Sequence, residues 1–232
     1  MEDENKNKIS LTGLEIPLVL AILALFFWRS PVLLPVKLLT VFFHELSHGL
    51  AAILTGGRIV SIDLNLNQGG VCTHQGGWFL IVASAGYLGS LLWGSGILLA
   101  SLKKGINQWL TRAIGAVLII VTCLWIRNIQ AVAITLTTAA ALLYISFKLK
   151  EEYCSIFLKF ISLISCFYVI FDIKDDLLDR TVPISDAYQI SNKIFPSFMA
   201  SAGSYIIGLL WLAIAVFVLW KVFKYALNPN RK

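Results

Sequence analysis

Two histidines separated by three residues are the strongest chemical signal in this sequence. His44 and His48 enclose Glu45 in a His-Glu-x-x-His pattern. On a helix, the two histidines lie one turn apart on the same face and can offer two imidazole nitrogens to one zinc ion. Glu45 is then placed to take a proton from a metal-bound water. The pattern therefore indicates a zinc-dependent hydrolytic site.

The surroundings of this motif are strongly hydrophobic. Between residues 41 and 54, Glu45 is the only acidic or basic side chain apart from the two histidines. Ionisable groups at membrane depth are costly and usually persist for a function. In a structural alternative, both histidines bond backbone groups in a helix-bundle core and Glu45 faces a polar cavity. The metal interpretation is favoured, because two of only three histidines in the chain fall at ligand spacing.

Composition assigns the class of protein independently of the motif. The chain is 58% hydrophobic and only 14% charged, which lies outside the range of ordinary soluble domains. Its net charge of +6 comes from Lys and Arg residues placed between hydrophobic segments. Such basic loops are typical of a multi-pass membrane protein and argue against nucleic-acid binding. We expect one integral-membrane domain over residues 1–232, with a short polar tail at 1–13 and no cleaved signal peptide.

The hydrophobic segments predict the architecture. A helix needs about 20 hydrophobic residues to cross the hydrocarbon core. Seven candidate spans follow, at residues 14–28, 32–55, 78–101, 109–126, 129–147, 153–171 and 198–223. The second contains the metal motif and is closed by two glycines. We predict an all-α polytopic protein of the cell membrane with about seven transmembrane helices.

A small β-hairpin is expected directly after the motif helix. Hydrophobic and polar residues alternate from 60 to 67, and this period of two is a strand signature. Gln68-Gly69-Gly70 supplies a turn, and residues 71–75 can return as a second strand. The free edge of such a hairpin could pair with an extended peptide. A plain surface hairpin explains the pattern equally well.

The third zinc ligand must come from elsewhere in the chain, because a catalytic zinc has three protein ligands and an open position. Asp186 is the preferred candidate, since small neighbours on both sides allow its backbone to approach a metal. Asp172 ends a hydrophobic run and could instead face the bundle interior. His74 is a third candidate, although an exposed hairpin histidine is its simpler interpretation. The break in the helical pattern from 172 to 196 also holds acidic residues expected on a solvated loop face: Asp175, Asp176 and Asp179.

The third predicted helix carries small residues at four-residue spacing. Gly86, Ser90 and Gly94 form this stripe. Such stripes allow helix backbones to pack closely in lipid. We expect them to press this helix against a neighbour, with the motif helix as the first candidate.

These motifs together resemble the site-2 protease group of intramembrane zinc metallopeptidases, in the M50 family and its M50B-like branch. The resemblance rests on the His44–His48 motif, the hairpin, the small-residue run Ser84–Ser90, and Ser185-Asp186-Ala187 near the end. In that group a late aspartate completes the zinc site, commonly followed by glycine, where this chain has alanine. The resemblance covers residues 33–99 closely and 172–210 more loosely.

The resemblance implies an intramembrane zinc metalloendopeptidase. Zn²⁺ would be held by His44, His48 and Asp186, with Glu45 as the catalytic base. The substrate would be a membrane-embedded protein or peptide, and the lipid bilayer the surrounding medium. The alternative is a non-catalytic metal-binding membrane protein, such as a transporter or a partner-binding scaffold. Orientation stays open, because the distribution of Lys and Arg favours an external hairpin and the resemblance implies a cytoplasmic one.

Overall fold

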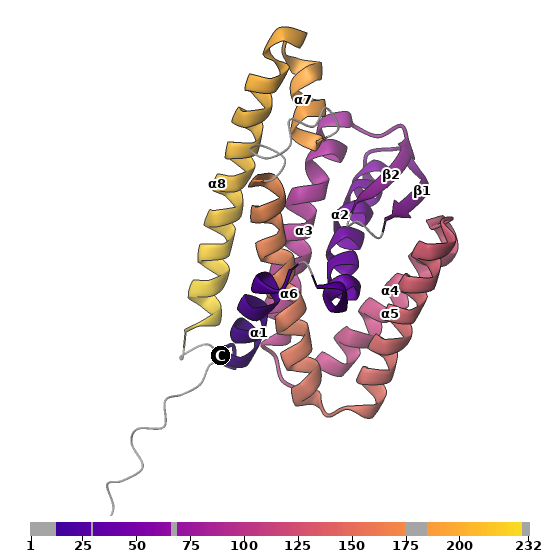
Figure 1. Cartoon of the computed structure of the whole chain (residues 1–232), viewed down its shortest axis with the longest axis vertical. Coiled ribbons are helices and arrows are strands. Elements are labelled where there is room, and N and C mark those ends of the chain that lie inside the picture. The colour runs from indigo at the N-terminus through magenta and orange to yellow at the C-terminus, as the bar shows by residue number, and fades with distance from the viewer. Residues whose placement is uncertain (1–12, 29, 66–68, 175–184, 229–232) are drawn as a thin grey trace, which may run out of the picture.

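A computed structural model describes the chain at residues 13–28, 30–65, 69–174 and 185–228 (Figure 1). Within these ranges the fold consists of eight α-helices and one small antiparallel sheet. Short 3₁₀ turns precede α2 and α8. The helices are α1 (Glu15–Phe26), α2 (Leu34–Leu54), α3 (Phe79–Ser101), α4 (Asn107–Trp125), α5 (Ile129–Lys148), α6 (Glu151–Lys174), α7 (Asp186–Ile194) and α8 (Ala200–Ala226).

Six of the described helices are long and hydrophobic enough to cross a membrane, namely α2, α3, α4, α5, α6 and α8. This confirms the prediction of an all-α polytopic membrane protein. The first of the seven expected spans is represented by α1, which has only 12 residues. A helix of that length covers about 18 Å, well short of a hydrocarbon core about 30 Å thick. Gly13, with a φ of +74°, precedes α1, and the 3₁₀ turn that begins at Pro31 follows it.

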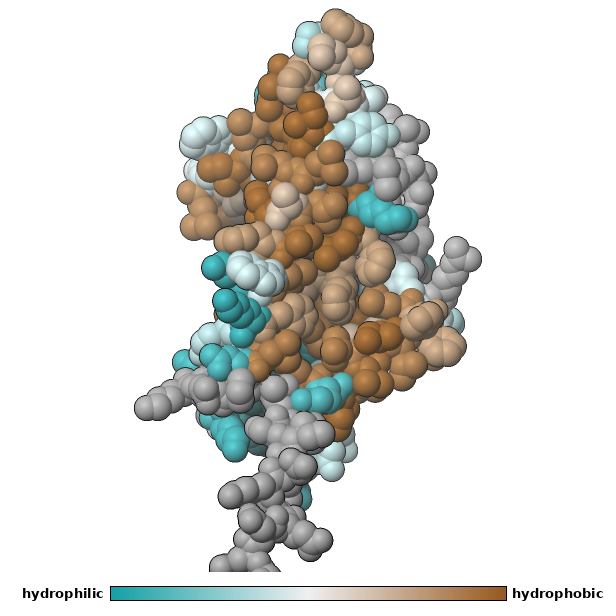
Figure 2. Space-filling view, turned by 90° about the vertical axis from the view of Figure 1, so that its left-hand side faces the viewer, coloured by the Kyte–Doolittle hydropathy of each residue, from teal (hydrophilic) through white to brown (hydrophobic). Residues whose placement is uncertain are grey.

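The motif helix α2 lies at the centre of the bundle. Of its most hydrophobic stretch, 83% is buried inside the protein, against 28% for α8. Phe42, Phe43 and Leu46 of α2 join a hydrophobic core that also takes in β1 and helices α3 to α6. The side chains of α8, in contrast, form a broad hydrophobic outer face (Figure 2). The fold therefore removes the ionisable groups of α2 from contact with lipid.

The small residues of α3 pack against two neighbours. A Cβ added at Gly86 would overlap side chains of α2, as the sequence led us to expect. Gly94 instead faces α6, where an added Cβ would lie 3.0 Å from the carbonyl oxygen of Ser162. The hydroxyl of Ser165 in α6 donates a hydrogen bond to the carbonyl of Ser90 at 3.2 Å. The stripe thus fixes α3 between the motif helix and α6.

The predicted hairpin is present as β1 (Arg58–Leu64) and β2 (Gly70–Gln75). The strands are antiparallel, with Ile62 opposite Cys72. Residues 66–68, which include Gln68 of the expected turn, lie outside the described residues. On its other side Ile62 forms a bridge with Ile126, which follows α4. Among the described residues no strand pairs with the outer side of β2, so β2 is the free edge.

The region from 172 to 196 differs from the expectation of a continuous non-helical break. Helix α6 extends through Asp172 to Lys174, and a further helix, α7, begins at Asp186. The hydroxyl of Ser185 accepts a hydrogen bond from the backbone N–H of Tyr188 at 3.2 Å and so caps α7. A serine cap followed by an aspartate is a favourable helix start, and it outweighs the polar character of the segment. The acidic residues Asp175, Asp176 and Asp179 lie outside the described residues.

Candidate metal centre

Helix α2 presents its two histidines together, as their four-residue spacing requires. The ring centroids of His44 and His48 lie 4.8 Å apart. Tyr87 of α3 packs edge-on against His44, with ring centroids 5.1 Å apart. Both histidine side chains are nearly buried, with exposed fractions of 12% and 10%. Their position on the central helix holds the rings at a fixed separation within the bundle.

Asp186 approaches the same point from the start of α7. Its Oδ2 lies 3.3 Å from Nε2 of His44 and 3.2 Å from Nε2 of His48. One ligand atom from each of these three residues falls within 4.8 Å of the other two. In the described part of the chain, this is the group of His, Cys, Asp or Glu side chains that can share one metal ion. Asp186, which is 138 or more positions from the two histidines in the sequence, thus lies beside them in the fold.

The hydrogen bonding of His48 identifies which ring nitrogen is available. Its Nδ1 lies 2.7 Å from the carbonyl oxygen of Val82 in α3. A carbonyl only accepts, so Nδ1 carries the hydrogen, and Nε2, which faces Asp186, is the nitrogen left to bind a metal. Histidines that bind metals are commonly oriented by such a bond from the other ring nitrogen.

The aspartate provides a negative charge at the same point. Burial alone would raise the pKa of the Asp186 carboxyl, but the adjacent imidazoles of His48 and His44 hold that pKa below its usual range. Its Oδ2 is buried and makes no hydrogen bond of good geometry with the described residues. A buried carboxylate oxygen facing two imidazole nitrogens is the donor set expected for a divalent cation such as zinc, with a fourth position left for water. The residues therefore fit a metal site.

Two glycines create the room that this arrangement needs. A Cβ at Gly86 would overlap Nε2 of both His44 and His48. A Cβ at Gly70, in the hairpin, would lie 2.5 Å from Oε1 of Glu45. Any larger residue at either position would press on a group of the site. The close approach of α3 and β2 to α2 therefore depends on glycine.

Glu45 is oriented by the hairpin. Its residue is 6% exposed, and its carboxylate accepts a hydrogen bond from the backbone of Cys72 in β2. Burial and the negative charge of Glu45 raise the pKa of the Cys72 thiol to about 12. Cys72 is thus a neutral thiol beside the glutamate, and its sulfur is not part of the three-residue cluster.

These groups line a cavity of about 340 Å³. Its walls come from α2, α3, α6, α7 and the strand β2. Of these elements, α7 and β2 lie at the upper end of the bundle in Figure 1. His74 and Asp172, the two other ligand candidates, also line this cavity but are not members of the cluster. His74 is half-buried, and its Nδ1 lies 2.9 Å from the carbonyl oxygen of Gly76.

Several residues of this cavity were not predicted from the sequence. Val82 contributes only a backbone carbonyl, which leaves no signal in the sequence. Tyr168 stands one helical turn before Asp172, so this spacing could have placed both on one face. Gln189 lies near Asp186 on α7, a helix that was not expected.

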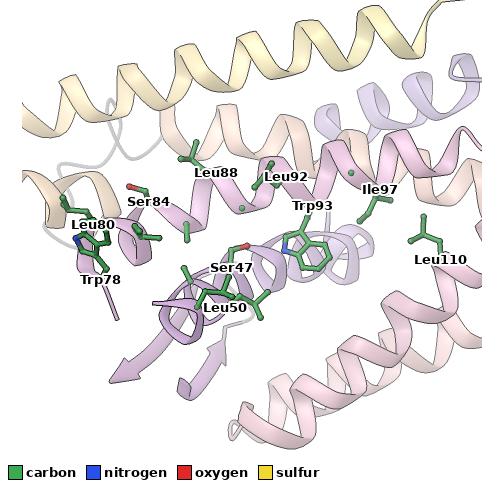
Figure 3. Close-up of a pocket in the computed structure, with 16 residues that line it drawn as sticks. Ser47, Leu50, Trp78, Leu80, Ser84, Leu88, Leu92, Trp93, Ile97 and Leu110 are labelled. Carbon is green, nitrogen blue, oxygen red and sulfur yellow. The ribbon is translucent and has the colours of Figure 1, made fainter. Parts of the chain in front are cut away.

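A second and larger cavity, of about 830 Å³, lies between α2, α3 and the start of α4 (Figure 3). It shares no lining residue with the cavity of the metal centre. Leu50, Leu88 and Leu92 line it, together with Ser47 (Figure 3). Because none of its lining side chains is ionisable, this cavity offers no group for acid–base or metal chemistry.

Comparisons with known proteins identify the family of this chain. A family model described as Peptidase M50B-like matches residues 17–222. No curated protein and no solved structure gives a match. The matched region contains all the residues of the candidate metal centre and confirms the resemblance found in the sequence. The chain therefore belongs to the Peptidase M50B-like family, a family of metallopeptidases.

Proposed function

We propose that this protein is an intramembrane zinc metalloprotease that hydrolyses peptide bonds of membrane-embedded substrates. The observation that carries this proposal is the meeting of His44, His48 and Asp186 beside Glu45, in a cavity among helices of spanning length. Zinc held by these three ligands would supply an acidified water and polarise the scissile carbonyl.

Glu45 acts in this proposal as the general base. Its carboxylate is buried, lies one residue from a metal ligand and faces the same cavity. The hydrogen bond from Cys72 holds it toward the hairpin, so that it can take a proton from the nucleophilic water and later pass it to the leaving amine. The exposed fractions of the ligands, between 10% and 14%, leave a route for water.

The strand β2 supplies the binding edge for the substrate. Its residues from Gly70 to Cys72 line the metal cavity, and its outer side is the free edge of the sheet. A substrate helix in a membrane has its carbonyls bonded internally, so it must unwind before hydrolysis. Pairing with β2 offsets the loss of those backbone bonds, which are expensive to leave unmade in lipid.

The proposal extends to the organisation of the chain. We assign residues 1–232 to one integral-membrane peptidase domain of the cell membrane. One hydrophobic core that joins α2, β1 and helices α3 to α6 supports a single folding unit.

The test replaces the proposed base and leaves the ligands in place. The variant Glu45→Gln should retain about one zinc per chain but lose cleavage of a helical transmembrane substrate. The matched control is Glu152→Gln, an exposed glutamate on α6 outside both cavities, which should keep metal and activity. Both are measured by metal analysis of purified protein and by cleavage in reconstituted vesicles.

Two results would count against the proposal. Cleavage by Glu45→Gln at the wild-type rate would rule out this glutamate as the base. Bound metal without cleavage in either wild type or variant, together with ion flux in liposomes, would favour a non-catalytic metal-binding membrane protein.

A further inference from the structure

A third cavity lies at the opposite end of the bundle from the metal centre. It has a volume of about 450 Å³, opens to the surface, and is lined by the C-terminal ends of α3 and α8 and the residues before α4. Leu99, Val222 and Ile106 provide hydrophobic lining. Lys103 and Lys221, which also line it, are both exposed. The cavity thus combines a hydrophobic lining with two exposed cations.

The positive charge of this region is not cancelled by ion pairs. Among the described residues, neither Lys103 nor Lys221 forms a salt bridge. The Nζ atoms of Lys221 and Lys224 lie 4.9 Å and 5.5 Å from the ring centroid of Trp220. These contacts hold the two ammonium groups close to α8, and neither group forms an ion pair with a described residue.

Glu151, an acidic residue at the same end of the bundle, is engaged elsewhere. The carboxylate of Glu151 accepts hydrogen bonds from the backbone N–H groups of Gly105, Asn107 and Gln108, which surround the start of α4. It also accepts one from the side-chain amide of Asn107 at 2.8 Å. Glu151 is therefore committed to the start of α4 and not to the lysines.

The position of the cavity along the helices indicates the chemistry of its surroundings. Both α3 and α8 are long enough to span a membrane, and the cavity lies where they end. Lysines and aromatic residues such as Trp220 and Tyr225 are typical of the boundary between hydrocarbon and headgroups. Figure 2 shows a hydrophobic face whose hydrophilic side chains gather toward its lower end.

We propose that this cavity binds an anionic phospholipid, with an acyl chain against Leu99 and Val222 and the phosphate at Lys103 and Lys221. A cavity with a hydrophobic lining does not hold water stably, so an acyl chain from the surrounding bilayer is its natural occupant. The two cations favour a headgroup with net negative charge over a zwitterionic one, as basic pockets between transmembrane helices do.

The experiment measures lipid binding to the purified full-length protein by native mass spectrometry. Phosphatidylglycerol and phosphatidylcholine with identical acyl chains are the two probes. Wild type should retain phosphatidylglycerol in preference to phosphatidylcholine. The double variant Lys103→Gln/Lys221→Gln should weaken phosphatidylglycerol binding on the order of thirtyfold. The matched control Lys148→Gln/Lys150→Gln removes the same charge outside the cavity and should bind as wild type does.

A second variant tests the hydrophobic part of the site. Ala100→Phe fills the cavity and keeps both lysines, and it should weaken phosphatidylglycerol binding as well. Inorganic phosphate should not displace the lipid, because it cannot fill the hydrophobic lining. Equal binding of the two lipids, equal loss in the Lys148/Lys150 control, unchanged binding by Ala100→Phe, or displacement by inorganic phosphate would each overturn the proposal.

Discussion

Gly86→Ala tests whether the fold and the metal centre are coupled as the structure indicates. The new Cβ would overlap Nε2 of His44 and His48 and lie 2.6 Å from Cε1 of His44, where ordinary contacts begin near 3.4 Å. Either the imidazoles rotate away or α3 withdraws by roughly 1 Å. Rotation removes the ligand atoms from their meeting point. Withdrawal lengthens the bond between His48 and the carbonyl of Val82, because Val82 belongs to the same helix.

Both responses weaken metal binding, and the expected size can be bounded. Loss of a group that orients a metal ligand typically lowers metal affinity about 10-fold to 100-fold. Overpacking a close helix contact costs about 1–3 kcal/mol of stability. We therefore expect Gly86→Ala to bind zinc at least about tenfold more weakly than wild type, as measured by competition with a chromogenic chelator.

Two matched variants on α3 separate the metal effect from packing. At Gly96 an added Cβ meets nothing within 4 Å, so Gly96→Ala should bind zinc as wild type does. At Gly94 an added Cβ meets backbone atoms of α6, so Gly94→Ala should lower the melting temperature without weakening zinc binding at a temperature where it stays folded. Wild-type zinc affinity in Gly86→Ala would refute the reasoning.

Three further changes have distinct expected results. Asp186→Ala should lower zinc affinity sharply, whereas Asp172→Ala should retain zinc in the same chelator assay. The reverse pattern would make Asp172 the third ligand and would leave the peptidase proposal standing. Gly70→Ala should reduce kcat and leave the zinc content unchanged, because the new Cβ displaces the Glu45 carboxylate but does not touch a metal ligand. Loss of zinc in this variant would contradict this expectation. Glu151→Ala should destabilise the fold by about 1–2 kcal/mol, since it removes the hydrogen bonds at the start of α4, and thermal unfolding in detergent measures the loss.

The local elements of this protein follow from contiguous residues. The hydrophobic stretches predicted the spanning helices, and the period of two after Gly57 predicted the hairpin, because both patterns are written within short windows. The spacing of His44 and His48 fixes them on one face of α2 whatever surrounds the helix. Even the small-residue stripe from Gly86 to Gly94 correctly indicated close helix packing.

Short stretches of sequence predicted the helices less well where the hydrophobicity of a segment did not match its helical extent. Helix α7 was not expected, because its segment is polar, yet the Ser185 cap and packing against α8 make it helical. Helix α1 is shorter than its hydrophobic run suggested, because it ends at Phe26 and a 3₁₀ turn begins at Pro31. In both cases contacts beyond the local window, or turn chemistry at its edge, decided the outcome.

Tertiary structure alone decided which aspartate lies beside the two histidines. Asp186 and Asp172 were both compatible with the sequence as third ligand, and only the packing of α7 brings the Asp186 carboxylate to the histidines. The carbonyl of Val82 orients His48 through a backbone atom that every residue possesses. Residue types and local periods determine which groups are available and on which face they lie. Packing between segments that are distant in the sequence and similar in hydrophobicity decides which of these groups come into contact. The order of residues along the chain does not contain that information.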